Sequence, residues 1–143
     1  MLRILVHEGP TPTLLGVQLP SEEGDACRRA VPYHKEAKLE VVLVCLTSFE
    51  KHDEGRIEEL VKAYSDNVKI DSYRLGAKRV LLYPYAHLSK NLGSQRQAKE
   101  FIKRPHEHLQ QHGYEDHRSP FGWYKAFTLT CIDHPLAEAY RKY

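Results

Sequence analysis

The sequence has few features of a secreted, membrane-bound or disulfide-stabilised protein. It contains three cysteines in 143 residues, an odd number, and Cys27, Cys45 and Cys131 stand far apart. This spacing argues against a disulfide scaffold and indicates a reducing compartment. The longest uninterrupted apolar run, residues 41–46, is far shorter than the roughly 20 residues that span a membrane. The chain opens on a strand-like segment and shows no signal-peptide pattern, so we expect a soluble, cytoplasmic protein with no membrane partner.

Charge of one sign is not in excess either. The 21 lysines and arginines are nearly balanced by 19 aspartates and glutamates, which gives a formal net charge of +2. This total argues neither for nor against a nucleic-acid partner, because a basic patch can lie within a balanced sum. The sequence also lacks repeats, low-complexity segments and an obvious linker. We therefore expect one domain over residues 1–143.

Apolar runs predict several strands, at residues 2–6, 14–19, 39–49 and 79–85. The continuous run at 41–46 is typical of a central strand that is buried on both faces. Residues 21–38 are polar and predict a long excursion or hairpin.

Periodic apolar positions predict two helices. The first begins at Asp53 as N-cap and has one apolar stripe, formed by Ile57, Leu60, Val61, Tyr64 and Val68. The second begins with a capping-box pair, Ser94 and Gln97, and ends at Gly113. Pro105 is expected to kink or break this second helix, because it removes a backbone donor at a cost of about 3 kcal/mol.

Residues 119–138, SPFGWYKAFTLTCIDHPLAE, form the most informative stretch. Alternation from Tyr124 to Cys131 predicts a half-buried strand, with Cys131 as a core thiol, and the tail from Pro135 predicts a short helix or irregular segment. Together the elements predict a mixed α/β or α+β domain.

Several side chains near predicted strand ends have two interpretations each. His87 follows a buried strand, where ligands bind in open α/β sheets, or it packs under a loop. Lys125 is a reactive group in an aromatic run, or it snorkels to water along its stem. Glu138 would ordinarily be a surface residue of a terminal helix. Tyr124 and Phe121 would ordinarily be core or rim aromatics, and His7 is equally ambiguous.

The histidines do not predict a metal site. His108 and His112 are four apart and can share a helix face, but His106 and His108 are two apart and cannot. Cys131 and His134 have no partner pair at zinc-site spacing. We expect no metal and no cofactor.

Four segments together resemble the amino-terminal editing domain of archaeal threonyl-tRNA synthetases: MLRILVHE, VVLVCLTSFEKHDE, VLLYPYAHLSKNL and SPFGWYKAFTLTCIDHPLAE. The resemblance extends from about residue 39 to 141, whereas residues 8–38 depart from the family's pattern. It implies a fold like that of D-aminoacyl-tRNA deacylases, a mixed sheet or partial barrel flanked by two main helices, in a homodimer. It also implies hydrolysis of serine wrongly esterified to threonine-specific tRNA. The sequence ends shortly after the last motif, so no aminoacylation domain is expected in it; editing in cis or in trans stays open.

The resemblance also implies which residues act. Lys125 and His87 are expected to be catalytic: a lysine of ordinary pKa, about 10.4, is protonated and can donate to the attacking water or the ester oxygens. His87 is expected to hold or deprotonate that water. The substrate-binding residues are expected to be Tyr124, Glu138, Phe121, Ala86 and Phe49. Cys131 as a nucleophile is the less favoured alternative.

Two other functions remain open from the sequence. A D-aminoacyl-tRNA deacylase would carry motifs of the type SQFTL and NxGPVT, which are absent from the sequence. A non-catalytic module that binds the 3′ end of tRNA would not need both Lys125 and His87. Expected partners are tRNA(Thr) carrying serine, a second copy of the chain and threonyl-tRNA synthetase. Lys99, Lys103, Arg104 and Arg118 either contact phosphates or form a solvated helix face.

Overall fold

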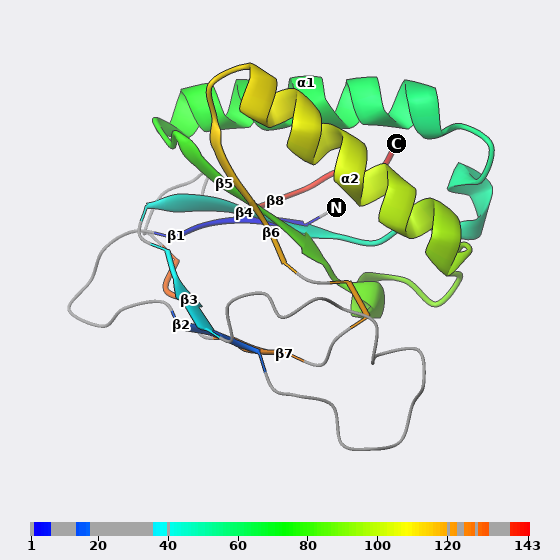
Figure 1. Cartoon of the computed structure of the whole chain (residues 1–143), viewed down its shortest axis with the longest axis horizontal. Coiled ribbons are helices and arrows are strands. Elements are labelled where there is room, and N and C mark those ends of the chain that lie inside the picture. Colours follow the sequence, from blue (N-terminus) through cyan, green and yellow to red (C-terminus); the bar gives the residue numbers. More distant parts are fainter. Residues whose placement is uncertain are drawn as a thin grey trace.

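Two α-helices, two 3₁₀ helices and two β-sheets make up the part of the chain that the computed structural model describes (Figure 1). The described residues are 2–6, 14–17, 36–39, 41–119, 121–122, 125–127, 129–131 and 138–143. Predictions for His7, Cys27, Tyr124 and His134 lie outside these residues.

The larger sheet has the strand order β6-β5-β4-β1-β8. Its strands are β1 (Leu2–Val6), β4 (Val42–Thr47), β5 (Arg79–Pro84), β6 (Glu115–Arg118) and β8 (Glu138–Tyr140). The three strands β4, β5 and β6 are parallel, whereas β1 is antiparallel to both β4 and β8. The predicted mixed sheet with two main helices is therefore confirmed.

The central position predicted for the 41–46 run is also confirmed. Every residue of β4 is buried. Leu43 and Cys45 face a core shared with the helices, and Val42, Val44 and Leu46 face a second core on the opposite side. A strand covered on both faces needs apolar residues at every position, which is why β4 shows no alternation.

Helix α1 (Ile57–Leu75) carries the predicted stripe toward the core, but it begins later than the sequence predicted. Leu60, Tyr64 and Val68 are buried. The prediction of Asp53 as its N-cap is wrong, because Asp53 ends a separate 3₁₀ helix, η1 (Lys51–Asp53). The Asp53 carboxylate accepts the N–H of Glu50 at 2.8 Å, and so caps η1.

Helix α2 (Gln95–Gln111) starts after Ser94, as predicted, but the expected capping box is wrong, and of the kink or break expected at Pro105 the break is absent. Gln97 does not close a capping box; its Oε1 accepts the N–H of Gly55 at 3.1 Å. Pro105 does not break the helix, which continues for six residues beyond it. The proline ring is fully buried on the apolar face, and this burial offsets the lost hydrogen bond.

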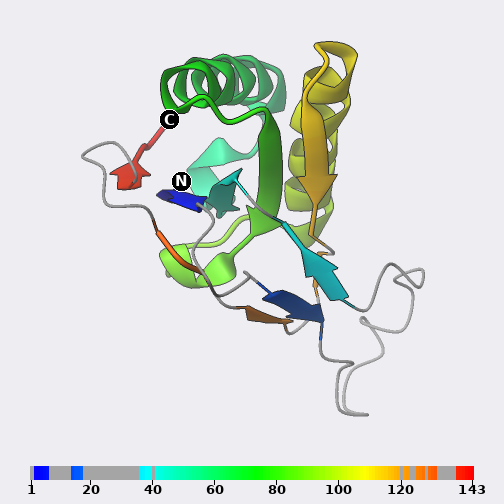
Figure 2. The same ribbon diagram turned by 90° about the vertical axis from the view of Figure 1, so that its left-hand side faces the viewer.

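A second, three-stranded sheet lies on the side of the main sheet opposite the helices (Figure 2). Its strands are β3 (Glu36–Lys38), β2 (Leu14–Val17) and β7 (Lys125–Phe127), in the order β3-β2-β7. Phe127 and Leu129 pack against the core on that face of the main sheet. The strand predicted within 124–131 is therefore present, as β7.

The end of the chain differs from the prediction. Residues 138–140 form edge strand β8 and no helix, with Glu138 opposite Ile4 and Tyr140 opposite Leu2. Hydrogen bonds to β1 satisfy backbone groups of this segment, and a local helical preference cannot compete with that pairing.

The two cysteines among the described residues divide between core and surface. Cys45 is buried, as predicted, whereas Cys131 is exposed, so the prediction of a core thiol there is wrong. Residue 131 lies beyond the last residue of β7, where alternation along the strand no longer buries a side chain.

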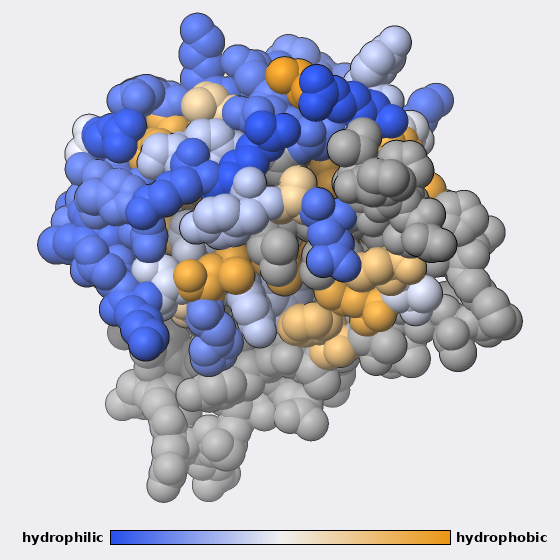
Figure 3. All heavy atoms as spheres, turned by 180° about the vertical axis from the view of Figure 1, so that it is seen from behind, coloured by the Kyte–Doolittle hydropathy of each residue, from blue (hydrophilic) through white to orange (hydrophobic). Residues whose placement is uncertain are grey.

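Hydrophilic side chains cover most of the helical layer on the face shown in Figure 3, and hydrophobic ones gather lower, near the level of the main sheet. The large apolar residues that are exposed are Val41, Ile70, Tyr73, Leu92 and Tyr140. Among the described residues, no helix is both long and apolar enough to cross a membrane.

A buried carboxyl group joins α2 to β6. Oδ2 of Asp116 lies 2.5 Å from Nδ1 of His106, and its Oδ1 is buried without a hydrogen-bond partner among the described residues. Burial raises the pKa of Asp116 from 3.8 to about 8, with Arg118 opposing part of this effect. Burial lowers the pKa of His106, and Arg118 lowers it further.

These pKa shifts predict a pH-dependent stability. Asp116 binds its proton more tightly in the folded state, so its contribution is fully present below pH 3.8 and is lost as pH rises through about 8. His106 acts in the opposite sense, and only below its unfolded pKa of 6.5. Between pH 6.5 and 8, urea titrations should show the free energy of unfolding falling by at most about 2 kcal/mol. Asp116→Asn should remove this decline; equal slopes in both proteins would contradict the assignment.

Candidate functional site

Strands β4, β5 and β6 end at one edge of the main sheet, here called the carboxyl edge. Because the three are parallel, Thr47 at the end of β4 lies opposite Pro84, and Leu82 lies opposite Arg118 at the end of β6. Ligands of open α/β sheets bind outside the carboxyl ends of the strands. The segments that follow β4 and β5 therefore form the candidate site.

The segment after β5 carries two of the predicted site residues. Ala86 and His87 belong to a 3₁₀ helix, η2 (Ala86–Leu88), and both are exposed. Tyr85 precedes them; its N–H donates to the carbonyl of Thr47 at 2.7 Å, and its ring centroid lies 5.4 Å from that of His87. The end of β4 thus fixes the start of η2 at the carboxyl edge.

The loop after η2 is held by the segment after β4. Glu50 forms an antiparallel bridge with Leu92, and the N–H of Gly93 donates to the carbonyl of Phe49 at 2.9 Å. A Cβ at position 93 would lie 2.7 Å from the Glu50 carbonyl oxygen and 2.8 Å from the Phe49 ring. Only glycine fits this approach without displacing its neighbours.

The Glu50 side chain adds a polar clamp. Its Oε1 accepts the hydroxyl of Ser89 at 2.5 Å, and its Oε2 lies 3.6 Å from His52 and 3.8 Å from the Lys142 ammonium. The hydrogen bond from Ser89 is the main cause that lowers the pKa of Glu50, and Lys142 lowers it further. Glu50 is thus kept ionised while it restrains the residue that follows η2.

Ring contacts connect η2 with the second sheet. The Phe127 ring lies 5.4 Å from Tyr83 and 6.2 Å from Tyr85, which in turn contacts His87. Strand β7 begins at Lys125, two residues before Phe127, and pairs it with Val17. The predicted catalytic positions, distant in sequence, therefore belong to segments that meet at the carboxyl edge.

Tyr83 is not a base in this cluster. Burial raises its pKa to about 12, with a contribution from Tyr85. Its hydroxyl stays protonated at neutral pH.

Phe49 and Phe121 lie on the helix-facing side of the main sheet. The Phe49 ring is buried, 5.6 Å from Phe101. Phe121 packs against the same core, and the Lys99 ammonium lies 5.6 Å from its ring centroid. Phe127 packs on the opposite face of the sheet.

Glu138 stands apart from the other predicted residues. It lies on β8, and its neighbour β1 and then β4 separate it from β5. Its carboxylate acts on Cys131: partial burial raises the pKa of the Cys131 thiol, and the negative charge of Glu138 raises it further. A raised pKa leaves little thiolate at neutral pH and makes Cys131 a poor nucleophile.

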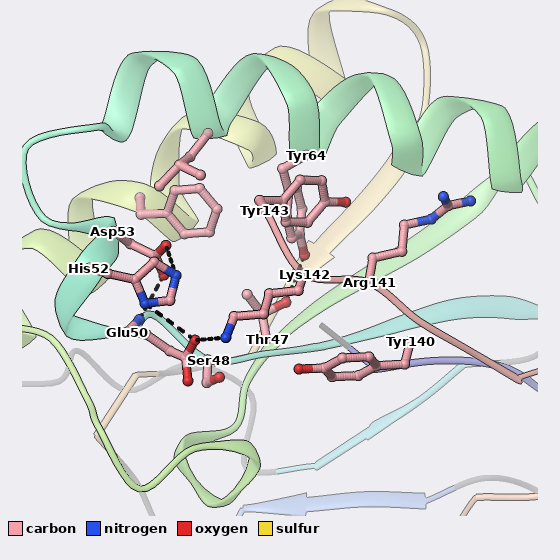
Figure 4. Close-up of a pocket in the computed structure, with 12 residues that line it drawn as sticks. Thr47, Ser48, Glu50, His52, Asp53, Tyr64, Tyr140, Arg141, Lys142 and Tyr143 are labelled. Atoms are coloured by element: carbon pink, nitrogen blue, oxygen red, sulfur yellow. Dashed lines mark hydrogen bonds and ion pairs between the residues drawn. The ribbon is translucent and has the colours of Figure 1, made fainter.

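A pocket opens beside this site, at the end of β4 (Figure 4). It is bounded by η1, α1 and the carboxyl-terminal segment 140–143, and its space of about 450 Å³ includes its open mouth. Its charged groups neutralise one another: Lys142 and His52 flank Glu50, and Arg141 binds Asp71 at 3.0 Å. None of the predicted site residues whose side chains the structure describes lines it. We interpret this pocket as the place where the carboxyl-terminal segment packs. Glu50 lines it and also binds Ser89 of the candidate site.

Sequence patterns did not single out Glu50, Ser89 and Gly93. Each is an ordinary loop residue by composition, and their roles arise from contacts across about 40 positions of sequence. The YPYAHLS block contains Ser89, but only the structure shows that its hydroxyl donates a hydrogen bond to Glu50.

The candidate metal histidines have other contacts. His106 pairs with Asp116, and the ring centroids of His108 and His112 lie 4.3 Å apart with their planes tilted by 36°. Within the described part of the chain, no group of three or more His, Cys, Asp or Glu side chains is arranged to hold a metal ion.

The sequence is similar to known proteins over most of its length. Residues 23–143 match the archaea-specific editing domain of threonyl-tRNA synthetase. The match thus begins earlier than residue 39, where the motif resemblance became clear. The chain is 42% identical over 110 residues to a threonine–tRNA ligase of Methanopyrus kandleri. The aligned region covers 77% of this chain and 18% of that protein.

Two further relatives give the same result. Threonine–tRNA ligases of Thermococcus gammatolerans and Pyrococcus horikoshii are each 41% identical over about 75% of this chain and 17% of their own length. The chain therefore spans less than a fifth of the curated relatives it matches. The family match over residues 23–143 shows that this chain belongs to the archaea-specific editing domains of threonyl-tRNA synthetase.

Proposed function

We propose that this chain hydrolyses the ester bond of L-serine wrongly attached to threonine-specific tRNA. Serine lacks one methyl group of threonine, and a synthetic site rejects a smaller substrate by only about 1–3 kcal/mol per methylene. A second site that removes the error is the general solution to this problem. Membership in a family of editing domains supports this role.

The observation that carries the proposal is the ring contact chain from β7 to η2. Phe127 touches Tyr85, and Tyr85 touches His87. Lys125 and Phe127 are two residues apart on β7, positions that share a face of a regular strand. An ammonium and an imidazole at one exposed edge are suited to attack by water on an ester.

The proposed reaction needs no covalent intermediate. A water oxygen attacks the ester carbonyl, the bond to the ribose oxygen breaks, and the proton lost by water ends on that oxygen. Lys125 stabilises the negative charge that develops on the carbonyl oxygen, and His87 holds the water and takes its proton. The neighbouring ribose hydroxyl assists. An aminoacyl ester is already activated, so positioning and charge stabilisation suffice.

The other predicted residues bind the substrate in this proposal. Tyr124 and Glu138 fix the seryl group or the terminal ribose, and Phe121 lines the pocket. The backbone near Ala86 and Phe49 meets the amino group. Since Glu138 stands on β8, its contact requires the substrate to extend from η2 past the end of β4.

The proposed setting is a cytoplasmic homodimer that acts on tRNA(Thr) and cooperates with threonyl-tRNA synthetase. No cofactor takes part. The carboxylates of Glu50 and Asp116 have structural contacts, and in this proposal His87 holds the water.

One assay tests this function. The same tRNA(Thr) is charged with radiolabelled serine or threonine, and release is measured with and without the protein. Serine should be released and threonine retained. Equal release of both amino acids, or of D-tyrosine in place of L-serine, would overturn the proposal. Tight binding of a non-hydrolysable seryl-adenosine without turnover would indicate a non-catalytic module.

A further inference from the structure

Eight lysines and arginines of the described residues are paired with a nearby carboxylate: the ion pairs are Lys51–Glu54, Arg56–Glu59, Lys69–Asp66, Arg79–Glu115, Lys103–Glu107, Arg104–Glu58, Arg141–Asp71 and Lys142–Glu50. Two of the cations that the sequence offered for phosphate contact, Lys103 and Arg104, are therefore already engaged.

Four cations close to the candidate site have no carboxylate partner within the described chain. They are Lys90, Arg96, Lys99 and Arg118, all of them exposed. We call them the basic face. Lys62, Arg74 and Lys78 are also without an acidic partner there, but they lie on α1 or just beyond its end.

Helix α2, which carries Arg96 and Lys99, packs beside strand β6, which ends at Arg118 (Figure 1). Arg96 and Lys99 are three residues apart and share one side of α2. The Lys99 ammonium lies over Phe121, which follows Arg118 by three residues. Arg118 acts electrostatically on His106, seven residues after Lys99 on the same side of the helix.

Lys90 extends the basic face to the proposed catalytic segment. It follows η2 directly after Ser89, whose hydroxyl is held by Glu50. The loop that carries it leads into the first turn of α2 and is fixed through Gly93. Lys90 therefore lies between His87 and Arg96 along a restrained stretch of chain.

The acidic groups near the basic face do not cancel its charge. Glu100 and Glu107 pair with Arg104 and Lys103, and Glu115 pairs with Arg79. Asp116 is buried, and burial raises its pKa to about 8, so it is largely protonated at neutral pH. The side of α2 toward β6 is therefore locally positive although the whole chain carries a formal charge of only +2.

We infer that the basic face binds the phosphate backbone of the RNA whose 3′ end enters the candidate site. This inference rests on the proposed function for the location of that 3′ end. Lysine and arginine contacts to phosphates are independent of sequence and supply much of the affinity for nucleic acids. The phosphates of an RNA continue outward from the 3′ end that is held in the site, so they would pass the cations that border η2 and Phe121. An acidic protein segment has no end that must enter the site, so the location of these cations favours RNA.

The salt dependence of RNA binding tests this inference. The probe is an uncharged RNA minihelix made of a tRNA acceptor stem with its single-stranded 3′ end. The slope of log Kd against log KCl concentration should fall by about 0.7 to 0.9 for each phosphate contact removed. Arg96→Gln combined with Lys99→Gln and Arg118→Gln should thus reduce it by about 2 to 3. Lys62→Gln, an unpaired lysine of α1, is the matched control and should leave the slope unchanged.

Three outcomes would overturn the inference. In the first, the combined variant keeps the full salt slope. In the second, Lys62→Gln reduces the slope by as much per removed charge as the combined variant does. In the third, the substitutions on the basic face abolish binding of polyglutamate and leave RNA binding unaffected. Because the RNA carries no amino acid, the result does not depend on hydrolysis. If the wild-type protein releases no serine while the combined variant shows the expected loss of RNA binding, the proposed function is rejected and the RNA-binding inference stands.

Discussion

His87→Ala is expected to slow serine release from seryl-tRNA(Thr) by about 10²- to 10⁴-fold, the loss typical of an acid–base group. His87 is exposed on η2, and its ring touches Tyr85, so its removal leaves the core intact. The rate should be measured at saturating seryl-tRNA, where a loss in kcat separates chemistry from binding. Added imidazole should restore part of the activity of the variant, which a structural role would not allow.

His112→Ala provides the control for this experiment. His112 is an exposed histidine just after the last residue of α2; its ring lies 4.3 Å from that of His108, and its Nδ1 hydrogen bonds to the His108 carbonyl at 2.7 Å. It should retain the wild-type rate. Lys125→Ala should be as slow as His87→Ala, and Lys125→Arg should recover part of the loss because a cation remains. Full serine release by either alanine variant would remove that residue from the mechanism.

Gly93→Ala is expected to be the second severe change. The new Cβ would meet the Glu50 carbonyl oxygen at 2.7 Å and the Phe49 ring at 2.8 Å. Neither atom can yield easily, because one belongs to the backbone and the other to a ring that is 5% exposed. Overpacking of this kind costs about 1–3 kcal/mol. The loop that holds η2 in place should shift, and a displacement of about 1 Å at a reacting group can cost 10²-fold in rate.

Urea unfolding and serine release should both be measured for Gly93→Ala. Leu92→Ala is the matched control, because its side chain is 47% exposed and its backbone bridge to Glu50 is unaffected. The control should stay within about 0.5 kcal/mol of the wild type. A Gly93→Ala protein that unfolds at the wild-type urea concentration and releases serine at the wild-type rate would show that the close approach has no role in the site.

Patterns of neighbouring residues predicted the elements in which local and tertiary preferences agree. The apolar run at 41–46 became the buried strand β4, and the stripe from Ile57 to Val68 became the inner face of α1. Sequence patterns were a poorer guide to which residues would form hydrogen bonds with each other. Asp53 caps η1 because its carboxylate reaches Glu50, and Gln97 binds Gly55 across 42 positions.

The site shows the same division. Motif blocks indicated His87, Ala86, Lys125 and Phe121, because those blocks are contiguous in the sequence. They did not indicate that Glu50 clamps Ser89, or that Lys99 covers Phe121. Glu138 shows the opposite case: the motif named the residue, yet the short helix or irregular segment expected there is strand β8, paired with β1 from the other end of the chain.

The sequence alone determined the family, the mixed sheet with two helices, and a short set of candidate residues, because hydrophobic periodicity and contiguous motifs are local properties of a chain. Only the tertiary structure decided which cations have no acidic partner among the described residues, which glycine has no room for a side chain, and which strand reaches the ring beside His87. Those properties depend on distances between residues far apart in sequence, and packing of the whole domain sets these distances.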